Sequence, residues 1–176
     1  TDSGYKTGVV PTAQVGMGFV SDSPGSKVES LYLASFGASS QLWKLNPLDP
    51  APIVATKVGN FAPSPTSPEM TGTGAAELYA YFPATDSSHR IIRVNKATAQ
   101  ADLTWTLPPL ASSPGAWAFA QWGGRYYVFV TENNVSRIYR WDPNATAASQ
   151  WVRVQDNLAT RIVGAGVSTC APTTVG

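Results

Sequence analysis

The 176 residues of this chain carry a formal net charge of +1, and only 13% of them are Asp, Glu, Lys or Arg. This balance gives no bulk attraction to nucleic acid or to anionic membranes, and no run of about 18 apolar residues predicts a membrane-spanning helix. A hydrophobic fraction of 43% predicts a folded chain, while the low charge favours an extracellular or envelope protein.

A unit of about 47 residues occurs three times along the chain. An apolar or aromatic pair marks each copy: Leu31 and Tyr32, Leu78 and Tyr79, and Tyr126 and Tyr127. A basic residue and a turn residue follow at similar spacing: Lys44 and Asn46, Arg93 and Asn95, and Arg140 and Asp142. Strand-rich repeats of this length are typical of β-propellers, whose blades are four-stranded antiparallel sheets. We therefore predict an all-β, propeller-type array in a single domain over residues 1–176.

The first repeat (residues 15–61) has expected strands at 15–20, 30–36, 41–45 and 52–58. The second (67–110) has them at 69–73, 77–82, 90–94 and 101–107, and the third (115–158) at 116–121, 125–130, 137–141 and 150–154. The first strand of each repeat is small and Gly-rich, which suits a crowded propeller axis, and the second is aromatic and β-branched, which suits a buried centre. Residues 162–170 begin a fourth repeat with a strand at 162–167, and residues 5–10 offer one more strand.

Three complete repeats do not make a closed ring, because closed propellers usually have about four to eight blades. Exposed sheet edges invite pairing with another chain. We expect either self-association, in which a dimer would supply about six blades, or missing upstream blades, or an open array. The start at Thr1 favours a processed or truncated product.

Four phrases carry a family resemblance: VGMGFVSDSPG (15–25), PEMTGTG (68–74), GAWAFAQWGG (115–124) and IVGAGVSTCAP (162–172). On these phrases the chain resembles the C-terminal half of the propeller-like domain of secreted proteins with a Cys-rich leader from myxobacteria and their relatives. The resemblance implies a propeller fold and a secreted or cell-surface location in a bacterium, but no activity. It also implies sequence upstream of residue 15 that would add blades and a partner for Cys170, the single cysteine.

Glu69 is the most suggestive side chain, because it places a carboxylate on an expected axial strand. The repeat spacing makes Ala116 and Val163 its counterparts, and both are small and apolar. A buried charge is costly unless it is paired. Glu69 therefore either binds a cation or a sugar hydroxyl near the axis, or accepts backbone N–H groups from a neighbouring blade.

The basic residues Lys44, Arg93 and Arg140 form a ladder with one member per repeat. They either make a surface for polyanions or acidic polysaccharides, or occupy solvated strand positions with their stems over apolar surface. The second interpretation accounts for the alternation of the third strands.

The chain has six Trp residues. Those that are buried are expected to stabilise the fold, whereas an exposed Trp could bind a ligand. Trp43, Trp105 and Trp151 fall inside strands, where packing between blades explains them. Trp122, beside the Gly123–Gly124 turn, is expected to be exposed and able to stack on sugar rings. The candidate ligand-binding residues are thus Glu69, Trp122, Arg93 and Arg140.

No catalytic, metal or cofactor site is predicted. His89 is the only histidine, and Asp86, Ser87 and Ser88 precede it directly, which describes a polar loop better than a catalytic triad. We expect a secreted or surface binding module without enzymatic activity, whose partner is a carbohydrate or a protein. The alternatives are a polysaccharide-active enzyme using axial carboxylates such as Glu69 and Asp22, and a self-assembling structural subunit.

Overall fold

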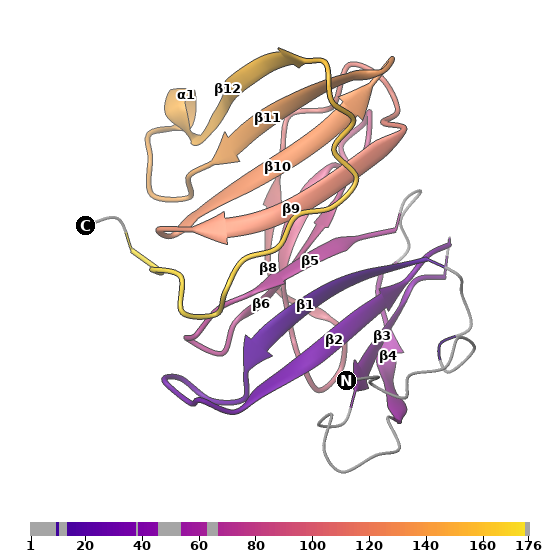
Figure 1. The fold of residues 1–176 in the computed structure, drawn as a ribbon, viewed down its shortest axis with the longest axis vertical. Helices are drawn as coiled ribbons and strands as arrows, with labels where there is room; N and C mark the ends of the chain where they lie inside the picture. Colours follow the sequence, from indigo (N-terminus) through magenta and orange to yellow (C-terminus); the bar gives the residue numbers. More distant parts are fainter. Residues whose placement is uncertain (1–9, 11–13, 38, 46–53, 63–66, 175–176) are drawn as a thin grey trace.

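The computed structural model describes residues 10, 14–37, 39–45, 54–62 and 67–174. They form three four-stranded antiparallel sheets, each built from strands that are consecutive in the chain (Figure 1). The first sheet contains β1 (Val15–Ser21), β2 (Glu29–Ser35), β3 (Gln41–Leu45) and β4 (Ala55–Asn60). The second contains β5 (Glu69–Gly72), β6 (Leu78–Phe82), β7 (Arg90–Val94) and β8 (Ala101–Thr106). The third contains β9 (Ala116–Trp122), β10 (Arg125–Glu132), β11 (Val135–Trp141) and β12 (Trp151–Leu158), with a single helical turn, α1 (Ala147–Gln150), before β12.

The predicted all-β class and the three four-stranded repeats are confirmed. The third strands β3 and β7 have the expected bounds, whereas β4 and β12 extend further toward the C-terminus than expected. The turn after β7 has the chemistry that the sequence predicted, because the Asn95 Oδ1 accepts N–H bonds from Ala97 (3.0 Å) and Thr98 (3.2 Å). The expected strand at residues 5–10 lies outside the described residues apart from Val10.

The second sheet is buried on both faces because the other two sheets pack against it. Leu78, Ala80 and Phe82 of β6 join a core cluster with residues of the first sheet. Tyr79 and Tyr81, which alternate with them, join a second cluster with residues of the third sheet. A continuous run of apolar residues in β6 thus serves two interfaces at once.

The inner strands β1, β5 and β9 lie beside one another, β1 against β5 and β5 against β9. Small residues allow this approach. A Cβ added to Gly72 on β5 would overlap the Phe19 carbonyl of β1, and one added to Gly16 on β1 would overlap the carbonyl of Pro68. Glycine at these positions lets two backbones meet where any side chain would separate them.

The C-terminal segment, residues 159–174, contains no strand, so the expected strand at 162–167 is wrong. The segment instead crosses from the third sheet to the first (Figure 1, yellow). The Ile162 N–H donates to the Ser136 Oγ (3.2 Å), the Gly123 N–H donates to the Pro172 carbonyl (2.7 Å), and the Thr169 hydroxyl donates to the Glu29 carboxylate. These isolated bonds replace the regular ladder that a fourth sheet would have provided.

The described residues include no helical segment with the length and hydrophobicity that a bilayer-spanning helix needs.

Candidate ligand-binding site

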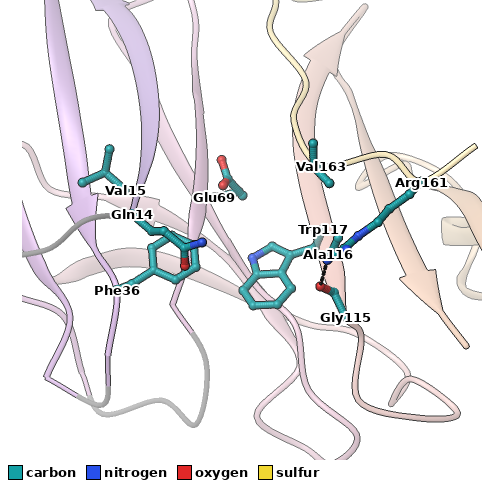
Figure 2. Close-up of a pocket in the computed structure, with 9 residues that line it drawn as sticks. All are labelled: Gln14, Val15, Phe36, Glu69, Gly115, Ala116, Trp117, Arg161 and Val163. Carbon is teal, nitrogen blue, oxygen red and sulfur yellow. Dashed lines mark hydrogen bonds between the residues drawn. The ribbon is translucent and has the colours of Figure 1, made fainter. Parts of the chain in front are cut away.

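A cleft of about 430 Å³ lies where the inner strands begin. Figure 2 shows the side chains around it, which come from all three sheets and from the C-terminal segment. They are Gln14, Val15, Phe36, Glu69, Gly115, Ala116, Trp117, Arg161 and Val163. The cleft therefore forms only when the sheets pack together, because its lining residues come from different repeats.

Glu69 is the only carboxylate among the described residues that line this cleft. It is the first residue of β5 and pairs in register with Tyr81 of β6, so both side chains lie on the face of the second sheet that packs against the third. None of the described residues donates a hydrogen bond to its carboxylate or forms an ion pair with it, so the predicted backbone N–H partners from a neighbouring sheet are not found. Burial raises the pKa of Glu69 from its ordinary value of 4.5 to about 7.

The strand register gives Glu69 different counterparts from those that the repeat spacing predicted. Tyr81, which pairs with Glu69, lies two residues after Tyr79. Tyr32 and Tyr127 are the equivalents of Tyr79 in the other repeats, so the equivalents of Tyr81 are Ala34 and Phe129. Ala34 pairs with Gly16 and Phe129 pairs with Ala118. The structural counterparts of Glu69 are therefore Gly16 and Ala118, in place of Ala116 and Val163. Both are small, so the carboxylate still stands out from its repeat.

Phe36 and Trp117 form the apolar part of the cleft. Their rings are stacked, with centroids 5.9 Å apart and planes inclined by 20°, and Glu69 lies above the pair in Figure 2. Trp117 belongs to β9 and faces the second sheet, while Phe36 follows β2 of the first sheet. The Trp117 Nε1–H is buried and has no hydrogen-bond partner within the described part of the chain.

Arg161 and Val163 bring the C-terminal segment to the rim of the cleft. The Arg161 Nη2 donates to the Gly115 carbonyl over 2.8 Å, a bond drawn in Figure 2. This bond holds an exposed guanidinium beside the opening, and Val163 is 65% exposed. The segment that fails to form a fourth sheet therefore builds one side of the cleft.

The four residues predicted to bind a ligand do not come together in one place. Trp122 is 56% exposed, as expected, but it lies at the opposite end of β9 from the cleft. Arg93 on β7 pairs with Glu77 at 3.0 Å on the surface, which fits the interpretation of a solvated ladder. Arg140 lies on β11 across from Tyr127, and its Nε is buried with no hydrogen-bond partner in the described chain. Only Glu69 belongs to the cleft.

The expected packing of Trp105 and Trp151 is confirmed in the cluster between the second and third sheets. Trp105 stacks on Tyr79 with planes inclined by 7°, and Trp151 stacks on Tyr139 with planes inclined by 4°. Trp43 instead packs against a smaller cluster on the face of the first sheet that is turned away from the second sheet, so the packing between sheets predicted for it is not found among the described residues. These three rings stabilise the fold, which leaves Trp117 as the indole of the cleft.

Asp86 and Ser87 lie in an exposed polar loop, as predicted, whereas His89, which follows that loop, is a buried structural residue. Its Nδ1 lies 2.5 Å from the Pro108 carbonyl and its Nε2 lies 3.0 Å from the Tyr81 hydroxyl. A carbonyl can only accept, so Nδ1 carries the proton and Nε2 accepts from Tyr81. Burial lowers the pKa of His89 and keeps the imidazole neutral at pH 7. Ser88 bonds Asp86 instead, over 2.5 Å, so no Ser-His-Asp relay exists here.

No cluster of three or more His, Cys, Asp or Glu side chains that could hold a metal ion occurs in the described residues. Cys170 is exposed and forms no disulfide there.

No protein-family model matches the chain, and a search of curated proteins finds no similar sequence. The resemblance to secreted myxobacterial proteins therefore stays a prediction.

Proposed function

We propose that the chain is a non-enzymatic binding module of a secreted or cell-surface protein, built on propeller-type repeats, with the Glu69 cleft as its ligand site. One observation supports the proposal: a partly buried carboxylate, which has no hydrogen-bond or ion-pair partner among the described residues, opens into a cleft beside a stacked aromatic pair. Buried polar groups are normally hydrogen-bonded, and an unpaired one costs free energy. A ligand that hydrogen-bonds to Glu69 would remove that cost.

The propeller-type arrangement is supported by the way the sheets follow one another. The face of the first sheet that carries Tyr32 packs against the second sheet, and the equivalent face that carries Tyr79 packs against the third. Each inner strand lies beside the next, as it does around a propeller axis. The cleft would then lie at one end of that axis, where ligand sites formed by several repeats are expected.

An enzyme that cleaves glycosidic bonds is the less favoured candidate. Such enzymes generally use two carboxyl groups about 5–10 Å apart. Glu69 is alone among the described residues of the cleft, because Asp22, the other expected carboxylate, accepts a hydrogen bond from the Ser30 hydroxyl (2.5 Å) and does not line it. The geometry therefore favours binding over hydrolysis.

Self-assembly is a second candidate, and the open face of the third sheet supports it. Tyr127, Phe129 and Ile138 are half-exposed on this face, whereas their equivalents in the second sheet are all buried. Light scattering over a range of concentrations tests this candidate. A mass that rises to that of a dimer supports it, and a monomer at every concentration excludes it.

The proposed function is tested by separating binding from turnover. The protein is incubated with soluble polysaccharides and with proteins of the bacterial surface, and both retained ligand and new reducing ends are measured. We expect a ligand to be retained without new reducing ends, and the Glu69→Gln variant to retain less of it. Hydrolysis of a polymer that Glu69→Gln abolishes would overturn the proposal in favour of an enzyme.

A further inference from the structure

We infer that the Glu69 cleft binds a neutral pyranose ring, which stacks on the Phe36–Trp117 pair and hydrogen-bonds to the Glu69 carboxylate and the Trp117 indole. This inference rests on the proposed function and names the ligand class of the same site.

The aromatic pair supplies the flat apolar surface that such a ring needs. A pyranose has one face of C–H groups and an equator of hydroxyls, so it presents an apolar side and a polar edge together. Aromatic residues with a polar handle suit ligands of this kind. The Phe36 and Trp117 rings are stacked 5.9 Å apart and Trp117 carries the polar handle, its Nε1–H. The volume of about 430 Å³ falls at the small end of ligand pockets, which suits a small sugar.

The polar groups of the cleft need a partner that both donates and accepts. The Glu69 carboxylate accepts hydrogen bonds, and the Trp117 indole only donates. A hydroxyl can do either, so two neighbouring hydroxyls of one sugar satisfy both groups. An apolar ligand would leave both unpaired, which would cost free energy at each.

The charges at the cleft disfavour an ionic ligand of either sign. Arg161 is permanently positive and is held at the rim by the Gly115 carbonyl, so it repels a cation. Glu69 repels an anion whenever it is ionised. Because burial raises its pKa to about 7, the carboxyl is only partly ionised at neutral pH and attracts a cation less than an ordinary carboxylate does. A neutral hydroxylated ring faces neither penalty.

The test is calorimetric titration of the whole chain with a panel of methyl glycosides: those of glucose, galactose, mannose, xylose, fucose and N-acetylglucosamine. Tetramethylammonium chloride is the cationic comparison. A single ring of this size is expected to bind with a Kd of about 1 mM. Glu69→Gln and Trp117→Phe should each weaken that binding about tenfold. Glu69→Gln replaces a charged acceptor with a weaker neutral amide oxygen, and Trp117→Phe removes the indole N–H donor. Trp122→Ala, which changes an exposed indole at the other end of β9, should leave it unchanged.

The variants are chosen so that a loss of binding can be distinguished from a loss of the folded state. Glu69→Gln preserves the shape of the side chain, Trp117→Phe keeps an aromatic ring at the position, and thermal unfolding checks that each variant is folded. If Trp117→Phe is unfolded, Phe36→Leu tests the aromatic surface instead, and the same weakening is expected.

Three outcomes overturn the inference, and they separate it from the proposed function. If no glycoside binds, or if binding is equal in wild type, Glu69→Gln and Trp117→Phe, the cleft is not a sugar site. If tetramethylammonium binds and Glu69→Gln abolishes it, the sugar assignment fails while the binding module stands. If a glycoside is hydrolysed in a Glu69-dependent manner, the proposed function fails although the cleft accepts sugars.

Discussion

Glu69 and Tyr81 lie directly opposite one another in the β5–β6 ladder, and their side chains share one face of the second sheet. The two side chains nevertheless have different surroundings. The Tyr81 ring is completely buried against the third sheet, where its hydroxyl bonds His89. The Glu69 carboxylate lies at the start of its strand and opens into the cleft beside Trp117. The interface between two sheets is therefore a core along most of its length and a candidate site at one end.

Glu69→Gln should change how stability depends on pH. The pKa of Glu69 is raised from 4.5 to about 7 in the folded protein, so the folded state holds a proton that the unfolded state has lost over this range. The contribution of Glu69 to stability is present below pH 4.5 and is lost as the pH rises through 7. We expect Gln, which does not titrate, to become more favourable relative to Glu between pH 4.5 and 7. Urea unfolding of both proteins across this range measures the difference, and a difference independent of pH contradicts the raised pKa.

Tyr81→Phe should destabilise the fold by about 1–3 kcal/mol, because it leaves the buried Nε2 of His89 without its donor. The ring itself is retained, so packing changes little. Tyr127→Phe is the matched control, since its half-exposed side chain lies on the open face of the third sheet and should change stability by less than about 0.5 kcal/mol. Chemical unfolding of the two variants compares them. Equal effects would mean that the Tyr81–His89 bond contributes nothing.

Glu132→Ala should cost about 1–3 kcal/mol, because it removes the acceptor of the Ser112 N–H, whereas Arg137 is partly exposed and keeps its ion pair with Asp156 at 3.0 Å. The Glu132 side chain is 2% exposed, bonds Arg137 at 3.0 Å and accepts the Ser112 N–H at 2.9 Å. Arg153→Ala removes the partner of a surface pair instead, with Asp156, and should cost no more than about 1 kcal/mol. Thermal and urea unfolding give both values. A cost for Glu132→Ala as small as that for Arg153→Ala would show that the contacts of Glu132 are dispensable.

Gly72→Ala should destabilise the contact between β5 and β1 by about 1–3 kcal/mol, because the added methyl group meets the Phe19 carbonyl and the backbones must move apart. Gly164→Ala is the control, since nothing lies within 4 Å of the Cβ it would add. Unfolding free energies of the two variants should differ by the full cost at Gly72. Similar values would mean that the inner strands do not pack as closely as described.

The strands were predictable because the repeat supplies its own alignment. Residues 41–45 and 90–94 match β3 and β7, since short alternating strands between clear turn residues leave little freedom. The expected strand at 162–167 failed for a physical reason. It shares the small, Gly-rich composition of an inner strand, but a strand needs a partner, and residues 168–174 contain no aromatic and β-branched strand to pair with it.

The cleft was predictable only in part. Glu69 could be found because a carboxylate interrupts a row of small residues. Phe36, Trp117 and Arg161 could not, because they belong to the first sheet, the third sheet and the C-terminal segment, and only packing brings them together. Spacing within a repeat shows which residues are equivalent, whereas a site between sheets is made of residues that are not equivalent.

That the Glu69 cleft is the ligand site is tested most directly by the indole N–H resonance of Trp117 in a nitrogen–proton correlation spectrum of the labelled protein. The chain has six Trp residues, and the Trp117→Phe variant identifies the signal by its loss. During titration with the tightest-binding methyl glycoside, the Trp117 resonance should shift progressively and the Trp122 resonance should stay in place. The same titration of Glu69→Gln should need about ten times more glycoside for an equal shift. A Trp117 resonance that stays fixed while the glycoside binds, as shown by shifts elsewhere, would contradict the assignment of this cleft as the ligand site.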